Sequence, residues 1–510
     1  MDVTAFLEDA AHFPGGHARE VLFPRTVDEV AEAIAGRSEI LPIGAQSSLT
    51  GGATPMGETL LSTAKLNRIL SETKTTITVA AGVTIAAVQE HLSQRGAWFP
   101  PAPTFTGATA GGTVSTNAAG AATFKYGTTR EWVQGLTVVL ADGGILRITR
   151  GQDRARNGVF DFEIPWRRYR IPVPTYDMPN VPKRSAGYYA TSGMDLIDLF
   201  IGSEGTLGVV VDVTFRVMSP APKTALALIP CANEGQALAV AGALRAASIA
   251  TFRSGDASGL QVAAIEDMDH RSIEILKEDG ADAKNNVAFP TGTSVALLAQ
   301  VELPHDLDNA TAYDQIASFR DGGTATPLVR LCRLLDEMDL FDVTELALPD
   351  DRARAAQLTA TREAVPAGVN QRVGAAKRSI DDRIAKTAAD MIVPFARFGE
   401  MMAAYRNGFE SRGLDYAIWG HISDGNVHPN VIPRSYDDVE RGREAILEFG
   451  RECARLGGCP LAEHGVGRSP VKQQLLRQLY GDEGIEQMRA VKRALDPSWK
   501  LSPGVIFSCT

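Results

Sequence analysis

Two glycine-rich stretches decide the fold of this chain: PIGAQSSLTGGATPMG at residues 42–57 and PAPTFTGATAGGTVSTNAAG at residues 101–120. Glycine lets backbone N–H groups approach an anion closely, so such stretches suit the pyrophosphate of a dinucleotide, although ordinary loops between strands are also rich in glycine. The Rossmann spacing G-x-G-x-x-G and the P-loop spacing G-x-x-x-x-G-K are both absent. A bound dinucleotide would therefore need another architecture.

The segments around these stretches alternate between helical and extended patterns. TVDEVAEAIAGR (26–37) predicts an amphipathic helix, followed by the strand EILPIG. TTITVAAG predicts a strand, VTIAAVQEHLSQRG a helix, and LTVVLADGGILRI a hairpin that turns at Asp142 and Gly143. Residues 151–190 lack clear periodicity and are expected to be irregular, whereas MDLIDLFIGSEGTLGVVVDVTFRVM predicts a helix, a turn and a strand. From about residue 220, TALALIP, EGQALAVAGALRAAS and TSVALLAQVEL predict a second α+β domain.

The bulk composition excludes several classes of protein. A net charge of -10 argues against nucleic acid as a partner, because phosphate needs a basic surface. No run of apolar residues is long enough to predict a transmembrane segment, and the N-terminus shows no secretory signal. Five scattered cysteines are typical of a reducing compartment. We expect a cytoplasmic enzyme, with peripheral attachment to the inner membrane as an alternative.

Four blocks, in this order and spacing, resemble the FAD-binding domain of the vanillyl-alcohol-oxidase type of flavoproteins. They are PIGAQSSLTGG, PTFTGATAGGTVSTNAAG, YGTTREWVQGLTVVLADG and IGSEGTLGVV. The resemblance implies an α+β fold with a two-part FAD-binding domain at 1–219, an α+β substrate domain with an antiparallel sheet at 220–465, and a C-terminal segment, 466–510, that returns to the flavin. In that family the first block holds the pyrophosphate, the second surrounds the flavin, and the E-G-x-x-G-V turn meets the adenine end.

The resemblance also implies which residues contact FAD. They are Pro42, Ile43, Gly44, Ala45, Gln46, Ser47, Ser48, Gly52, Pro103, Gly107, Ala108, Thr109, Gly111, Gly112, Thr116, Asn117, Glu204, Gly205, Gly208 and Val209. Many members attach the flavin covalently through a histidine. Neither glycine-rich stretch contains a histidine, so we expect non-covalent FAD.

HISDGNVHPN at residues 421–430 holds two of the eight histidines between two strand-like segments. Asp-Gly favours a two-residue turn, and with Asp424 and Gly425 in the turn His421 would face His428, with Cβ atoms about 5 Å apart and Asn430 on the same face. Two such imidazoles can reach one metal, although histidine pairs also occur on hairpin surfaces without one. AEHGVGR (462–468) adds Glu463 and His464, and two His with one Glu is a familiar set for a catalytic zinc ion.

H-x-x-D-G-N-x-H followed by E-H-G-x-G resembles the C-terminal domain of FAD-linked D-2-hydroxy acid dehydrogenases, which include D-lactate, glycolate and D-2-hydroxyglutarate enzymes. The resemblance implies that His421, His428 and Glu463 bind a divalent metal, with zinc preferred and manganese, iron or cobalt as alternatives. It also implies that His464 is the catalytic base and that Asn430 contacts substrate.

Two upstream stretches extend this second resemblance, because TREAVP and KTAADMIVP are similar to family motifs and would place Arg362 and Lys386 on the substrate carboxylate. The chain departs from the family at Ser423, at Pro366 and at Ser502. Ser502 stands where an asparagine usually meets the flavin, so it is also expected to contact FAD. The first two departures bear on substrate identity and the last on flavin reactivity.

The expected reaction is the metal-assisted oxidation of a D-2-hydroxy acid to the 2-oxo acid, with hydride transfer to flavin N5 and His464 as base. One alternative is a metal-independent flavin oxidase of an alcohol, phenol or amine. A second alternative is a zinc hydrolase, in which the glycine-rich stretches are only structural. The electron acceptor could be a carrier protein, a quinone or oxygen, and a homodimer is one option for the assembly.

Overall fold

The computed structural model describes residues 3–101, 103–165 and 167–508. Its contacts divide the chain into two compact units. Unit 1 contains residues 1–120, 127–219 and 457–510, and unit 2 contains residues 121–126 and 220–456. Glu463 and His464 therefore belong to the same unit as both glycine-rich stretches.

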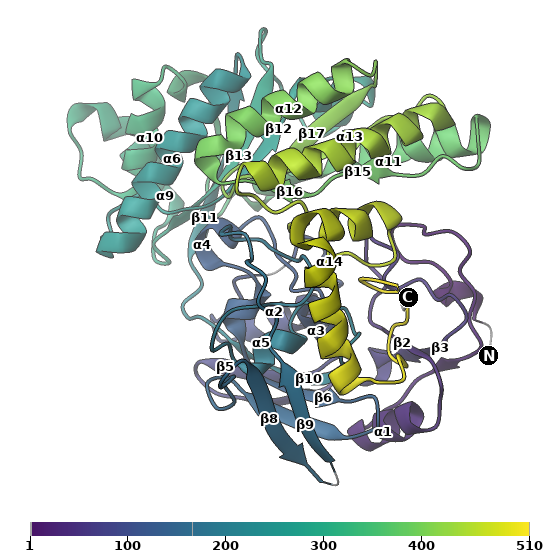
Figure 1. Cartoon of the computed structure of the whole chain (residues 1–510). Helices are drawn as coiled ribbons and strands as arrows, with labels where there is room; N and C mark the ends of the chain where they lie inside the picture. Colours follow the sequence, from purple (N-terminus) through teal and green to yellow (C-terminus); the bar gives the residue numbers. More distant parts are fainter. Residues whose placement is uncertain (1–2, 102, 166, 509–510) are drawn as a thin grey trace. The chain divides into compact units, whose positions relative to one another are not determined.

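Unit 1 is built on three sheets (Figure 1). A small parallel sheet has the order β1-β3-β2, and a five-stranded antiparallel sheet has the order β4-β5-β10-β6-β7. A separate hairpin pairs β8 with β9. The strands are β1 (Val21–Leu22), β2 (Ile40–Ile43), β3 (Thr59–Ser62), β4 (Ile69–Glu72), β5 (Thr76–Ala80), β6 (Val133–Val139), β7 (Ile145–Thr149), β8 (Val159–Ile164), β9 (Arg167–Pro172) and β10 (Val209–Arg216).

The helices of unit 1 are α1 (Val27–Ala35), α2 (Ile85–Ser93), α3 (Ala110–Ser115), α5 (Leu196–Phe200) and α14 (Pro470–Leu495). Helix α1 begins after Thr26, whose hydroxyl accepts from Glu29 N, and it buries Val30 and Ile34 in the core of the unit. The C-terminal segment lies beside β2, because Ile40 N donates to Lys500 O and Ser502 N donates to Ile40 O.

One expectation for unit 1 was wrong in part, because the stretch 151–190 is irregular only outside β8 and β9. Within residues 151–190, strands β8 and β9 form a regular antiparallel hairpin, with Phe162 opposite Tyr169 and their rings stacked 5.3 Å apart. Every second residue faces inward, including Phe160 and Ile171, which are buried. The charged side chains on the outward positions and the flanking prolines obscured this period of two.

Unit 2 is built on one antiparallel sheet of order β14-β11-β13-β12-β17-β18-β15, with β16 paired to β18. Its strands are β11 (Lys223–Cys231), β12 (Val262–Met268), β13 (Val295–Leu303), β14 (Glu345–Ala347), β15 (Thr387–Ala388), β16 (Met391–Ile392), β17 (Tyr416–His421) and β18 (Asn426–Val431). This confirms the predicted antiparallel sheet of the second α+β domain. No helix in the described ranges is long and apolar enough to cross a membrane.

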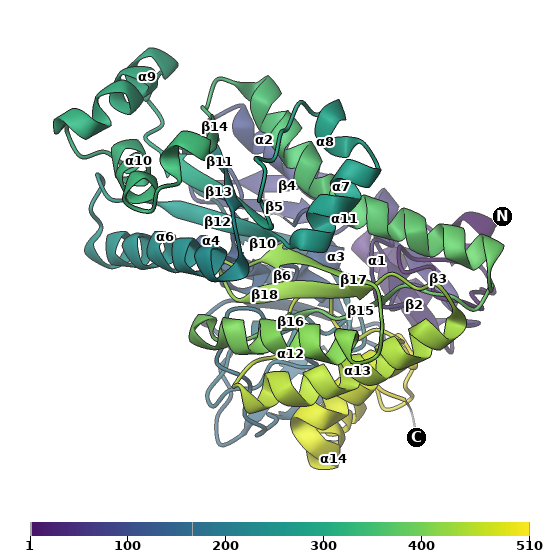
Figure 2. The ribbon, with the colours of Figure 1, turned by 90° about the horizontal axis from the view of Figure 1, so that it is seen from above.

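Helices cover both faces of this sheet (Figure 2). Helices α7 and α11 pack on one face, where Trp419 and Met268 join the core of the unit, and α6 and α12 lie over the other. The helices of unit 2 are α4 (Thr123–Tyr126), α6 (Glu234–Ser254), α7 (His270–Glu278), α8 (Ala281–Lys284), α9 (Asn309–Ser318), α10 (Pro327–Glu337), α11 (Arg352–Ser379), α12 (Phe398–Glu410) and α13 (Tyr436–Arg455).

Candidate active site

The first glycine-rich stretch leaves β2 as a loop with exposed backbone donors. None of the N–H groups of residues 45–49 donates a hydrogen bond to another described residue. Gln46 has a positive φ of 50°, and its side chain holds the loop by donating to Phe6 O and Ala53 O. Consecutive free N–H groups form a concave site for an anion, as a pyrophosphate requires.

The second stretch enters the short helix α3. The Thr109 hydroxyl accepts from Gly112 N and caps this helix. Two glycines let the backbone pack closely against neighbouring side chains at this point. A Cβ on Gly44 would lie 2.3 Å from Thr109 Oγ1, and a Cβ on Gly111 would lie 2.7 Å from the Cβ of Ala81. Asn117, at a φ of 48°, fixes the end of the stretch by accepting from Arg130 N.

The turn at Glu204 connects this region to the C-terminal segment. Glu204 accepts from Val466 N and Gly467 N, each at 2.8 Å. Burial raises the pKa of Glu204 to about 7, although both backbone hydrogen bonds oppose that shift. Gly205 has a φ of +72°, and a Cβ there would lie 2.7 Å from Cγ of Pro42.

These three segments line one cavity of unit 1, with a volume of about 300 Å³. Eighteen of the residues implied to contact FAD line it: Pro42, Ile43, Gly44, Ala45, Gln46, Ser47, Ser48, Gly52, Pro103, Ala108, Thr109, Gly111, Gly112, Thr116, Glu204, Gly205, Gly208 and Val209. Gly107 and Asn117 lie outside the lining, and Ser502 is buried behind Gly205, where an added Cβ would lie 3.2 Å from Ser502 Oγ.

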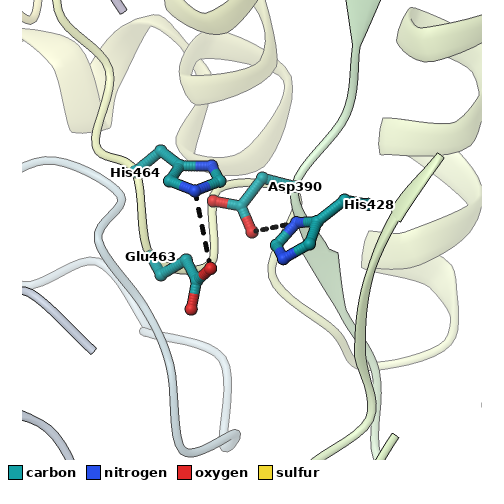
Figure 3. A group of neighbouring side chains, drawn as sticks. All are labelled: Asp390, His428, Glu463 and His464. Carbon is teal, nitrogen blue, oxygen red and sulfur yellow. Dashed lines mark ion pairs between the residues drawn. The ribbon is translucent and has the colours of Figure 1, made fainter. Parts of the chain in front are cut away.

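Glu463 and His464 line the same cavity. The Glu463 carboxylate lies 3.0 Å from Nζ of Lys183, which is fully buried, and its other oxygen lies 3.5 Å from Nε2 of His464 (Figure 3). His464 is 27% exposed, so its ring is accessible from the cavity. No sequence motif marks Lys183, which lies in the stretch 151–190.

In unit 2 the histidine hairpin forms, but its predicted register is wrong. His421 pairs with Asn426 and His428 pairs with Trp419, because the turn contains four residues, 422–425, instead of two. Both common two-residue hairpin turns need a positive φ at their first central residue, and Asp424 does not have one, whereas Gly425 does. His421 and His428 are therefore diagonal neighbours on one face, with ring centres 5.5 Å apart.

Each histidine has a buried carboxylate beside Nδ1. His421 Nδ1 lies 2.6 Å from Oε1 of Glu266 on β12, and His428 Nδ1 lies 3.5 Å from Oδ1 of Asp390 (Figure 3). Asn426 holds Asp390 in turn by donating to its Oδ1 at 3.1 Å. We call this part of the sheet, formed by His421, His428, Glu266 and Asp390, the histidine face.

The three residues predicted to bind substrate lie in different settings. Arg362, on α11, pairs with Glu266 at 2.5 Å, while its buried Nε has no hydrogen-bond partner in the described part of the chain. Asn430 is buried on β18, and its Nδ2 donates to His428 O. Lys386 is exposed immediately before β15. Thus Arg362 and Asn430 join the histidine face.

Comparison with known families identifies both parts of the chain. A family model described as "FAD binding domain" matches residues 18–149, and one described as "FAD linked oxidases, C-terminal domain" matches residues 234–506. A solved structure of an alkyldihydroxyacetonephosphate synthase shares the fold, with a TM-score of 0.59 and 14% identity, over 95% of this chain and 75% of that one.

Several curated proteins are similar over nearly the full chain. Glycolate oxidase subunit GlcD of Bacillus subtilis (strain 168) is 28% identical, over 96% of this chain and 88% of that protein. D-2-hydroxyglutarate dehydrogenase of Xanthomonas citri pv. viticola is 27% identical, over 96% and 89%. D-lactate dehydrogenase of Anaerostipes hadrus is 26% identical, over 98% and 92%. Because the match at 234–506 covers more than half of the 510 residues, the chain belongs to the FAD-linked oxidases and is a flavin-dependent oxidoreductase.

Proposed function

We propose that this oxidoreductase converts a D-2-hydroxy acid of the lactate, glycolate or 2-hydroxyglutarate class to the 2-oxo acid, using non-covalent FAD and a divalent metal. The observation that carries the proposal is the histidine face, where two histidines on one sheet surface are each backed by a buried carboxylate. The names of the similar proteins, which refer to glycolate, D-2-hydroxyglutarate and D-lactate, support the substrate class.

The cavity of unit 1 suits FAD. The unpaired N–H groups of residues 45–49 can bind a pyrophosphate, and the glycines leave room for backbone approach. Among the described lining residues the single histidine is His464, to which we assign the role of base. A non-covalent flavin should therefore stay in the supernatant after acid precipitation of the protein, and a yellow pellet would contradict this part of the proposal.

The histidine face suits a metal. A histidine that binds a metal through one nitrogen usually donates its other N–H to a carboxylate, as the 2.6 Å contact of His421 Nδ1 with Glu266 allows here. Asp390 lies at ion-pair distance, 3.5 Å, from His428 Nδ1. With metal–nitrogen bonds of about 2 Å at a tetrahedral angle, two imidazole ring centres lie about 5 Å apart. The observed separation of 5.5 Å is compatible with this geometry.

We assign Glu463 as the third ligand, as the family resemblance implies, and zinc as the preferred ion over manganese, iron or cobalt. Lys183 Nζ, 3.0 Å from the Glu463 carboxylate, orients that side chain within unit 1. Two His and one Glu leave a coordination position open for substrate.

When bound, FAD would supply a hydride acceptor and a metal held by His421, His428 and Glu463 would supply Lewis acidity for the substrate. In this proposal His464 takes the hydroxyl proton on its imidazole, and its position in the lining of the cavity of unit 1 supports the assignment. Arg362 keeps donors beyond the one that pairs with Glu266, and with Asn430 and Lys386 it orients the substrate carboxylate. The acceptor of the electrons is a carrier protein, a quinone or oxygen.

A dye-coupled screen of D- and L-2-hydroxy acids, run on metal-replete protein, tests this proposal. We expect turnover with one or more D-acids and none with their L-enantiomers. Turnover of simple alcohols, phenols or amines that survives complete removal of the metal would instead support the alternative of a metal-independent oxidase. The hydrolase alternative is not retained, because the family is one of flavin-linked oxidoreductases.

A further inference from the structure

Unit 2 contains a second cavity, of about 460 Å³, on the sheet face opposite the histidine face. Strands β12 and β17 form its floor, and helices α6 and α12 supply apolar walls. Its volume lies in the range of small-molecule sites. The apolar side chains on the walls and floor include Leu238, Phe398, Met402 and Ile418.

Asp267 is the central polar group of this cavity. It is 3% exposed, and its carboxyl group makes no hydrogen bond or ion pair with any other residue that the structure describes. Burial raises the pKa of Asp267 well above 3.8, and the nearby carboxylates of Asp269 and Glu234 raise it further. A buried carboxyl group without a partner is costly, so it needs a functional explanation.

Glu234, the first residue of α6, provides a second open acceptor. One of its oxygens pairs with Arg406, whereas Oε1 is buried and has no hydrogen-bond partner among the residues described. The other charged groups of the cavity are already engaged. Asp269 accepts from Ser272 N and Ile418 N, and Arg271 pairs with Asp415.

The charges of the lining favour a cation. Five carboxyl groups face two arginines and the exposed His270, and the carboxyl groups are those of Glu234, Asp267, Asp269, Glu274 and Asp415. A hard metal ion needs about six oxygen ligands, whereas among these five carboxyl groups only that of Asp267 and Oε1 of Glu234 make no hydrogen bond or ion pair with a described residue. An ammonium group needs three acceptors at most and tolerates an apolar chain attached to it.

We propose that this cavity binds a small organic cation, an ammonium group on a short apolar chain. Asp267 and Glu234 Oε1 accept from the ammonium, and Leu238, Phe398 and Met402 contact the chain. The site is separate from the proposed metal site, because adjacent residues of β12 serve the two faces: Glu266 contacts His421, and Asp267 faces the cavity.

Calorimetric titration of the FAD-loaded protein with n-alkylammonium ions, from methyl to hexyl, tests the proposal. We expect saturable binding that strengthens about fourfold with each added methylene until the cavity is filled, because each buried CH₂ contributes about 0.8 kcal/mol. The n-alkanols and n-alkanoates of equal length should bind at least about tenfold more weakly. Equal binding of all three series, or no saturable binding of any ammonium ion, would overturn the proposal, as would displacement of butylammonium by Mg²⁺.

Two variants locate the site. Asp267→Asn should weaken butylammonium binding about tenfold or more, since a hydrogen bond to a charged partner is lost, whereas Asp306→Asn makes the same change at an exposed position and should have no effect. Met402→Trp keeps every charge but fills the cavity, and it should abolish binding. If Asp267→Asn does not fold, Met402→Trp decides the matter, because unchanged binding in that variant would place the cation elsewhere.

Discussion

The glycine-rich loops of unit 1 and the histidine face of unit 2 prepare ligand sites in opposite ways. The loops present backbone N–H groups, and their glycines are needed because added Cβ atoms would collide with Thr109, Ala81 and Pro42. The histidine face presents side chains held by other side chains, from strands and a helix far apart in the sequence. Loss of one side chain should therefore weaken metal binding at the histidine face. FAD binding to the loops should weaken only where an added Cβ keeps the backbone away from the cofactor.

The largest expected effect comes from His464→Ala. Removing the proposed base should slow flavin reduction by D-2-hydroxy acids by about 10²–10⁴-fold, while FAD content stays normal because the cofactor is held mainly by backbone groups. Anaerobic stopped-flow absorbance of the flavin measures this rate. The exposed His305, replaced by Ala, is a matched control that should change nothing. A near-normal rate in His464→Ala would remove this residue from the mechanism.

The second largest effect is on metal affinity, which should depend on the histidine face and not on the loops. Glu266→Gln should lower metal affinity by about 10–100-fold, because it weakens the hydrogen bond that orients His421, and FAD content should not change. Asp390→Asn should lower metal affinity less, because Asp390 lies 3.5 Å from His428 whereas Glu266 lies 2.6 Å from His421. Elemental analysis after dialysis against a chelator gives the comparison. A loss of FAD without a loss of metal would contradict the assignment.

Gly44→Ala should have the opposite selectivity, because it changes the loops and should affect FAD binding instead of metal binding. Its Cβ would lie 2.3 Å from Thr109 Oγ1, so the loop must shift, and we expect FAD to bind about tenfold more weakly at unchanged metal affinity. Gly36→Ala is the control, because Gly36 ends α1 with a φ of -84° and its Cβ would make only ordinary contact. Titration of each apoprotein with FAD measures the affinity of the two variants. Equal FAD affinities of Gly44→Ala and Gly36→Ala would show that the loop tolerates the shift.

The smallest effect concerns pH. Burial raises the pKa of Glu204 from 4.5 to about 7, so the folded cofactor-free protein holds a proton that the unfolded chain releases. Its contribution to stability is present below pH 4.5 and is lost as pH rises through about 7. Between about pH 5 and about pH 8 the melting temperature of the apoprotein should fall more steeply than that of Glu204→Gln. Parallel profiles would show that Glu204 does not titrate in this range.

The contrast between the two regions also explains what the sequence could predict. The FAD loops are local in sequence, and 18 of the residues assigned from their motifs line one cavity. The hairpin motif placed His421 near His428, but in the wrong register, because the size of a turn depends on contacts such as that of Gly425 with Val393. Glu266 was missed because it is 155 residues from His421, and a carboxylate on an apolar strand gives no local signal of its partner.

The most direct test of the central claim is anaerobic flavin reduction by paired D- and L-2-hydroxy acids, in metal-stripped and metal-restored protein. The proposed roles of the loops and the histidine face predict that FAD stays bound after stripping, and that the flavin absorbance bleaches rapidly only with a D-acid and restored metal. Rapid bleaching by the same D-acid in protein shown by elemental analysis to be free of metal would contradict it.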